Sequence, residues 1–146
     1  MKDGNELLAS MGQFTGSMTL YRHPLVRRFT YTEGVRHFAL NAGGGAVWLL
    51  DILATEPAIR NLVLGDGPDC GFASVRIFVE GTKGTITVDD GNGNVKFTRV
   101  LDYTDCPERP AARSQHDDAQ GWLFFIEPNQ LGDGTTCMTM MWPSER

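Results

Sequence analysis

The chain has 146 residues, of which 41% are hydrophobic and 21% charged, a composition typical of one soluble domain. No apolar run approaches the ~18 residues of a membrane span, and the first residues lack the basic and apolar regions of a signal peptide. The formal net charge of -5 argues against a protein that simply coats nucleic acid. We therefore expect a single cytoplasmic domain over residues 1–146, with no membrane contact.

The first sixty residues are predicted to be mainly helical. Residues 5–11 suit a short helix, and residues 14–24 suit a loop because a glycine and a proline interrupt them. A longer helix follows, since Thr30 and Glu33 fit a capping box and apolar residues then recur with helical spacing. After a glycine-rich stop, residues 46–54 are apolar nearly all round, which predicts the central and most buried helix.

Residues 72–142 are predicted to be mainly β-strand, because the apolar period changes from helical to two. Five strands are expected, over residues 75–80, 85–88, 95–103, 122–126 and 136–142. Two helices followed by hairpin-connected strands predict an α+β fold, with both helices on one face of an antiparallel sheet of about five strands. Both faces of 122–126 are apolar, so this segment is either a central strand covered on both sides or a partner-binding face.

The residues that most often hold metals or cofactors are poorly arranged. Cys70, Cys106 and Cys137 are odd in number and widely spaced, which argues against both a disulfide framework and a zinc site. The turn at 89–94 lacks the glycine and the final glutamate of a calcium loop. Close helix packing explains Gly43–Gly45 better than a phosphate loop does, because no Gly-Lys-Ser/Thr is present. The sequence predicts no cofactor and no metal.

Charge is divided unevenly along the chain. Residues 1–60 carry six basic and five acidic groups, a net +1, whereas residues 61–146 carry seven basic and thirteen acidic groups, a net -6. An acidic surface is therefore predicted on the sheet half, and it would steer association with a basic partner. Its candidate residues are Asp66, Asp69, Asp89, Asp90, Asp102, Asp105, Glu108, Asp117 and Asp118.

The opposite charge gathers within residues 21–36. Arg22, Arg27, Arg28 and Arg36 face a single acidic residue there, Glu33. Such a cluster is also a footprint of nucleic-acid binding, which would weaken steeply with salt. A nucleic-acid-binding accessory protein is therefore kept as an alternative hypothesis.

A polar cluster is predicted from Tyr21, Arg22, His23 and Asp51. Asp51 interrupts an apolar helical segment, and an unpaired buried carboxylate is costly. We expect it to lie in the core, paired with a side chain of the 21–23 loop. The pair would be either a structural clamp or a general acid–base couple of an enzyme. His37 is expected to be largely solvated.

Several short motifs recur in a recognisable order. They are Phe14-Thr15-Gly16, Tyr21-Arg22-His23, Tyr31-Thr32-x-Gly34-Val35, Ala46-x-Trp48-Leu49-Leu50-Asp51, Asp90-Gly91-Asn92-Gly93-Asn94, Tyr103-Thr104-Asp105 and Pro143-Ser144-Glu145. This order resembles a family of small bacterial proteins of unknown function, often carried by phages and plasmids. Cys106 stands where the resemblance leads us to expect an aromatic residue, and the 107–120 loop is long. The resemblance implies a mobile-element accessory protein and supplies no catalytic residues.

The leading hypothesis is a small interaction protein with a protein partner. More specifically, the acidic surface would occupy a basic nucleic-acid channel of a bacterial defence complex, as an inhibitor of the anti-CRISPR kind. The first alternative is an enzyme with a site built from Arg22, His23 and Asp51. The second is the nucleic-acid accessory protein that uses the arginines of residues 22–36.

Overall fold

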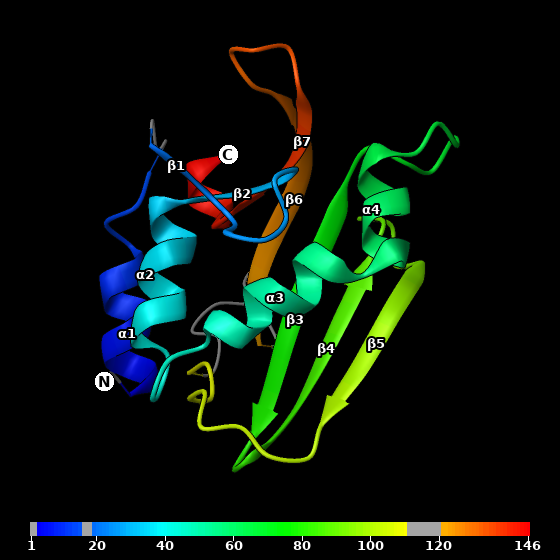
Figure 1. Cartoon of the computed structure of the whole chain (residues 1–146). Coiled ribbons are helices and arrows are strands. Elements are labelled where there is room, and N and C mark those ends of the chain that lie inside the picture. Colours follow the sequence, from blue (N-terminus) through cyan, green and yellow to red (C-terminus); the bar gives the residue numbers. More distant parts are fainter. Residues whose placement is uncertain (1–2, 16–18, 111–120) are drawn as a thin grey trace.

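The computed structural model describes residues 3–15, 19–110 and 121–146. Seven strands form one mixed sheet, with helices packed against it (Figure 1). The helices are α1 (Gly4–Met11), α2 (Glu33–Asn41), α3 (Val47–Thr55), α4 (Pro57–Leu64) and the short 3-10 helix η1 (Pro143–Glu145). The strands are β1 (Leu20–Arg22), β2 (Phe29–Thr32), β3 (Ala73–Glu80), β4 (Lys83–Asp89), β5 (Val95–Leu101), β6 (Trp122–Gln130) and β7 (Thr136–Met141).

The sheet has the order β1-β2-β7-β6-β3-β4-β5. All neighbours are antiparallel except β2 and β7, which run parallel. The α+β class is confirmed, but the expectation of two helices on an antiparallel sheet of about five strands is wrong, because the described residues form four α-helices and a mixed sheet of seven strands. Strands β1 and β2 fall where a loop and a helix start were predicted. They are only three and four residues long, too short to show a period of two in the sequence.

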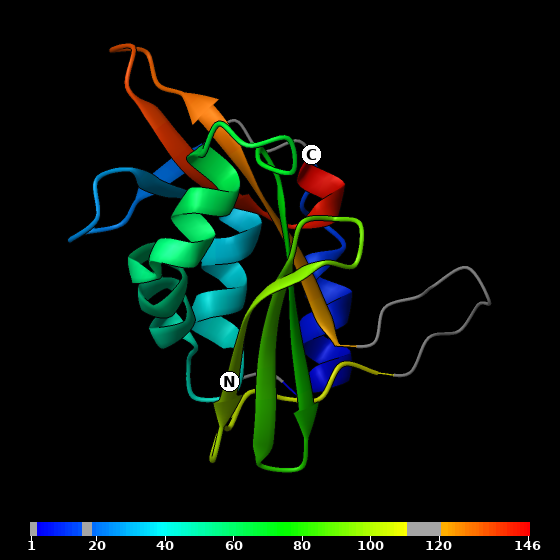
Figure 2. The same cartoon turned by 90° about the vertical axis from the view of Figure 1, so that its right-hand side faces the viewer.

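Strand β6 is the fourth of seven, so the prediction of a central strand is confirmed. Trp122, Phe124 and Ile126 are fully buried on one face, where Phe38 of α2 meets both aromatic rings edge-on. Helices α2, α3 and α4 lie on this side of β3 (Figure 2). On the other face Phe125 is half-buried, and the Arg146 guanidinium lies 5.6 Å from its ring centre.

The start of α2 differs from the predicted capping box. Thr32, not Thr30, is the N-cap, and its hydroxyl accepts a hydrogen bond from Val35 N at 3.4 Å. Thr30 lies in β2, with its hydroxyl 2.8 Å from that of Thr139 on β7. Pairing between β2 and β7 therefore keeps Thr30 extended and delays the helix by two residues.

The prediction that residues 46–54 form the most buried helix is wrong. Helix α3 is buried along one side only: Leu50 and Leu53 are buried, whereas Val47, Asp51 and Thr55 are exposed at intervals of four residues. Pro57 begins α4, since proline at a first helical position gives up no hydrogen bond. None of the helices in the described segments is long and apolar enough to cross a membrane.

Candidate functional site

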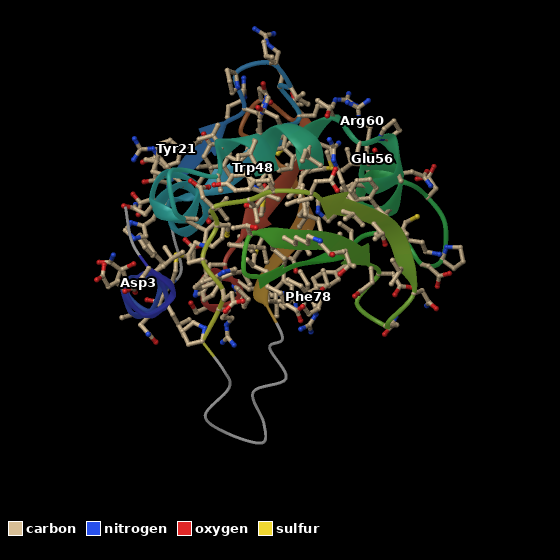
Figure 3. All side chains as sticks on the ribbon, turned by 90° about the horizontal axis from the view of Figure 1, so that it is seen from below. Asp3, Tyr21, Trp48, Glu56, Arg60 and Phe78 are labelled. Atoms are coloured by element: carbon tan, nitrogen blue, oxygen red, sulfur yellow. The ribbon has the colours of Figure 1, made fainter. Side chains whose placement is uncertain are left out.

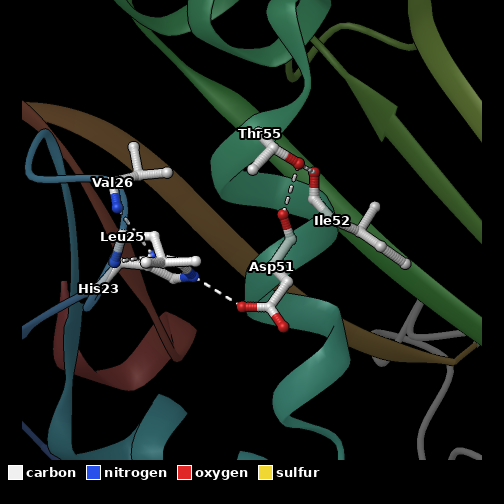
Figure 4. A network of polar contacts seen from close by, with 6 residues as sticks. All are labelled: His23, Leu25, Val26, Asp51, Ile52 and Thr55. Atoms are coloured by element: carbon white, nitrogen blue, oxygen red, sulfur yellow. Dashed lines mark hydrogen bonds and ion pairs between the residues drawn. The ribbon is translucent and has the colours of Figure 1, made fainter.

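His23 and Asp51 form the predicted pair. The His23 Nε2 atom lies 2.7 Å from Asp51 Oδ1, and the contact joins the β1–β2 hairpin to α3 (Figure 4). The expected burial is reversed, because the His23 side chain is 2% exposed and the Asp51 side chain is 60% exposed. A carboxylate that remains in water does not pay the desolvation cost on which the core prediction rested.

The second ring nitrogen of His23 is also engaged. The backbone N–H groups of Leu25 and Val26 donate to Nδ1 at 3.1 and 3.0 Å. Nδ1 is therefore the unprotonated nitrogen, and Nε2–H donates to Asp51. A general base needs a lone pair that can reach a substrate proton, and both ring nitrogens are committed within the protein. This geometry is that of a clamp on the hairpin.

Tyr21 and Arg22 do not join this pair. The Tyr21 ring stacks on Tyr31 with centroids 5.8 Å apart, and the Arg36 guanidinium lies 4.9 Å from the Tyr21 centroid. Arg22 is exposed and faces the β6–β7 turn. There, the Thr135 amide is the main cause that lowers the pKa of Asp133, and Arg22 adds a smaller electrostatic contribution. Of the predicted four-residue cluster, only His23 and Asp51 contact each other in this way.

The tip of the clamped hairpin was not identified from the sequence. Leu25 is 86% exposed, the largest value among the exposed large hydrophobic side chains of the described segments. The next residue, Val26, packs against the core, and its carbonyl accepts from Phe29 N at 3.1 Å. Arg27 and Arg28 are exposed beside the tip. An apolar side chain is therefore displayed among cations on a fixed turn.

A second polar cluster, also missed, joins α1 to α2. The Ser10 hydroxyl lies 2.8 Å from His37 Nε2 and donates to the Leu7 carbonyl at 2.9 Å. The Asn41 amide nitrogen lies 3.4 Å from His37 Nδ1 and 2.8 Å from the His37 carbonyl, so it donates to both. His37 consequently donates to Ser10, the reverse of the polarity that activates a serine nucleophile. The expectation that His37 is largely solvated is wrong: it is half-buried, with Phe14 5.2 Å away.

The acidic residues do not form one surface. Asp66 and Asp69 follow α4, and Asp89 and Asp90 stand at the β4–β5 turn. Asp102, Asp105 and Glu108 follow the far end of β5, which a seven-residue strand places roughly 20 Å away. Asp117 and Asp118 lie outside the described residues.

Several of these carboxylates hold the chain's own backbone. Asp90 is buried and accepts hydrogen bonds from the Asn94 side chain and the Asn92 backbone, which lower its pKa. Glu108 accepts from Gly81 N at 2.7 Å, and Asp105 Oδ2 accepts from Gly44 N at 2.8 Å. The glycine-rich turn therefore binds a carboxylate of its own chain, a role that sequence spacing did not reveal.

A buried carboxylate at the C-terminal segment supports the start of α2. Glu145 accepts from the Thr32 hydroxyl at 2.6 Å, from Gly34 N at 3.1 Å and from Trp142 N at 3.0 Å. A Cβ at position 34 would collide with a Glu145 carboxylate oxygen, so a larger residue there would displace this carboxylate. The Gly34 and Glu145 motifs, more than a hundred residues apart, thus form one structural unit.

The cysteines show no disulfide among themselves. All three are free, and Cys106 and Cys137 are buried. Burial, helped by the nearby Asp105 charge, raises the pKa of Cys106 to about 12, which leaves its thiol unreactive at neutral pH. Among the described residues, no three His, Cys, Asp or Glu side chains are grouped so that they could hold a metal ion.

Residues 5–146 match the family of unknown function DUF6876. The chain belongs to this family. The match confirms the resemblance to a family of unknown function over nearly the whole chain. No curated protein and no solved structure matches the chain.

Proposed function

We propose that this chain is a binding protein that docks on a protein partner through the β1–β2 hairpin. The observation that carries the proposal is Leu25, 86% exposed on a turn that His23 fixes. Exposing a large apolar side chain on a rigid turn gains nothing in the free protein. A bound partner would bury this side chain, and little conformational entropy of the loop would be lost because the turn is already ordered.

The chemistry around the tip suggests what the partner surface offers. Arg22, Arg27 and Arg28 are exposed around Leu25. A complementary surface would have an apolar pocket with a rim of carboxylates, because protein interfaces usually have an apolar centre and a polar or charged rim. Tyr21 adds no stacking platform for a nucleic-acid base, since Tyr31 stacks on it and Arg36 lies over its ring.

The identity of the partner is a finer proposal. We propose a component of a bacterial defence complex in the cytoplasm, with this chain acting as a mobile-element inhibitor of the anti-CRISPR kind. The separation of charge supports it: the basic hairpin and the exposed carboxylates Asp66, Asp69 and Asp102 lie in different regions, so two oppositely charged surfaces of a complex can be engaged. Expression of the chain should then restore phage plaquing in a host protected by the targeted complex. Unchanged plaquing with every defence system tried contradicts this finer proposal.

The hairpin itself is tested by site-specific photocrosslinking in bacterial cells. A photoreactive side chain at Leu25 should give one discrete protein adduct, and the same group at Leu40, exposed on α2, is the matched control. The double variant Arg27→Glu/Arg28→Glu should abolish the adduct. Equal adducts at both positions, or none at Leu25, contradict docking through this hairpin. Adducts with nucleic acid instead of protein would favour the nucleic-acid alternative.

A further inference from the structure

Two sequence motifs without a role so far meet at one cavity. Trp48, at the start of α3, and Tyr103 and Asp105, just after β5, line a cavity of about 200 Å³ together with Leu101 and Thr104. Figure 3, seen from below, shows Trp48 on α3 beside the segment that leaves β5. The Tyr103 side chain is 73% exposed. A cavity this small is below the usual size of a drug-like site, so it suits one side chain or a small ion.

The lining has a specific chemistry. Two aromatic rings and Leu101 form apolar walls, and the one charged group is the Asp105 carboxylate. Aromatic faces attract cations through their ring quadrupoles. A neutral apolar ligand would cover Asp105 and leave its charge without compensation, at a desolvation cost. A cation satisfies both the rings and the carboxylate.

The position of Asp105 is fixed by the glycine turn. A Cβ at position 43 would collide with the Asp105 carbonyl group, and one at position 44 would lie 2.5 Å from Asp105 Oδ2. Gly44 N donates to that same oxygen at 2.8 Å. The turn therefore fixes the side chain of Asp105, a residue of the cavity lining.

The residues around the cavity are mainly acidic, like Asp105. Glu80, Asp102 and Glu108 lie at this end of the sheet, together with Lys83 and Arg109. Within residues 101–109, which carry most of the cavity lining, Asp102, Asp105 and Glu108 are acidic and Arg109 is basic. A positively charged ligand is thus favoured over an anion before any direct contact.

We propose that this cavity binds the guanidinium of an arginine side chain presented by a protein partner. A planar guanidinium can stack on an aromatic face while donating to a carboxylate, whereas an ammonium presents only a compact charge. The site goes beyond the hairpin proposal and does not depend on it, because it lies on α3 and the segment after β5.

The test uses the full chain and short blocked peptides observed by NMR. Acetyl-Gly-Arg-Gly-amide should shift the Trp48 indole N–H resonance, assigned by Trp48→Phe, with a dissociation constant in the millimolar range. The indole signal of Trp142, the residue before η1, is the internal control; Trp122 is not used because its indole N–H donates to the Pro107 carbonyl, close to Asp105 in sequence. The peptide with neutral citrulline in place of arginine should cause no saturable shift, and the lysine peptide should bind more weakly.

Variants identify the contacts. Tyr103→Ala and Asp105→Asn should each weaken arginine binding roughly tenfold; asparagine keeps an acceptor for Gly44. Leu40→Ala and Asp66→Asn, exposed sites elsewhere, are matched controls that should leave binding unchanged. The proposal would be overturned if the citrulline peptide caused equal shifts or if Trp48 showed no saturable shift. It would also be overturned if the Tyr103→Ala variant bound the arginine peptide as tightly as the wild type. A failed crosslink at Leu25 would leave all of these results as they are.

Discussion

The two edges of the sheet are built in opposite ways. Figure 1 shows β1 and β5 at the two ends of the sheet, which six strand spacings place roughly 29 Å apart. The β1–β2 edge is short and fixed by contacts with distant residues, namely His23 with Asp51 and Thr32 with Glu145. The β5 edge is seven residues long, is exposed along most of its length, and pairs with β4, its neighbour in sequence.

The comparison shows that polar side chains stabilise the fold at the β1–β2 edge and protect the strand from intermolecular pairing at the β5 edge. At β1–β2 they replace the hydrogen bonds and burial that a three-residue strand cannot supply. At β5 the exposed side chains of Lys96 and Arg99 protect the outer edge of the strand from pairing with another chain. The register shift at Val88/Asp89 discourages such pairing as well. Breaking contacts at the first edge should therefore affect folding, and breaking them at the second should affect solubility.

The largest expected effect is at Glu145. Glu145→Ala removes the acceptor for Thr32, Gly34 N and Trp142 N, and should lower the free energy of unfolding by about 3 kcal/mol. Urea denaturation measures it. Glu145→Gln retains acceptor capacity and should lose less. A loss no larger than that of Glu127→Ala, at a more exposed ion pair with Arg146, would mean that the β1–β2 edge is held mainly by packing.

The clamp should respond unequally to loss of its two partners. His23→Ala leaves the Leu25 and Val26 amides without their acceptor and should cost about 2 kcal/mol. Asp51→Ala should cost less than ~1 kcal/mol, because the carboxylate is mostly exposed. The same denaturation curves compare them. Equal losses would indicate that the His23–Asp51 hydrogen bond, not the pair of backbone hydrogen bonds in the turn, carries the stabilisation.

The β4–β5 turn should contribute a pH dependence. Hydrogen bonds from Asn94 and Asn92 hold the pKa of Asp90 below its usual range. The folded state thus favours ionised Asp90, so its contribution is complete above the ordinary carboxyl pKa of about 3.9 and is lost as pH falls through the lower folded value. Stability followed by urea unfolding should fall less steeply with acid in Asp90→Asn than in the wild type. Asp66→Asn is the control, and an identical slope in both variants would contradict the role of the turn.

The smallest effect on stability is expected at β5. Lys96→Val/Arg99→Val should change the free energy of unfolding by less than ~0.5 kcal/mol, since both side chains are exposed. It should nevertheless promote concentration-dependent association, measured by light scattering, because two guarding charges are lost. Lys83→Val, at the hairpin turn, is the control. A double variant that stays monomeric would show that the bulge alone protects the edge.

The sequence predicted the elements that show a local hydrophobic period, but few of the features that depend on pairing between distant residues. Strands β3 to β7 are each six or more residues long and were all anticipated. Strand β2 was missed because its parallel partner β7 follows about a hundred residues later. Strand β1 was missed because it has only three residues and pairs with β2. The His23–Asp51 contact was anticipated from the cost of a lone carboxylate. Its reversed burial was not, although Val47, Asp51 and Thr55 already trace an exposed helical stripe.

The candidate sites follow the same division. The exposed arginines could be predicted from charge alone. Leu25 could not, because only the clamp on His23 reveals that the adjoining leucine points outward while Val26 packs inward. Nor could the cavity at Trp48, which requires the segment after β5 to cross to the start of α3.

The cap that Glu145 provides for α2 has a consequence for synthesis on the ribosome. Gly34 and Glu145 are 111 positions apart, and β2 also pairs with β7. A nascent chain can fold its β3–β4–β5 meander early, but the helix that carries Phe38 and the basic hairpin must wait until the last strand has emerged. Partner-competent protein should therefore appear only after β7 and Glu145 have emerged, in a single late step.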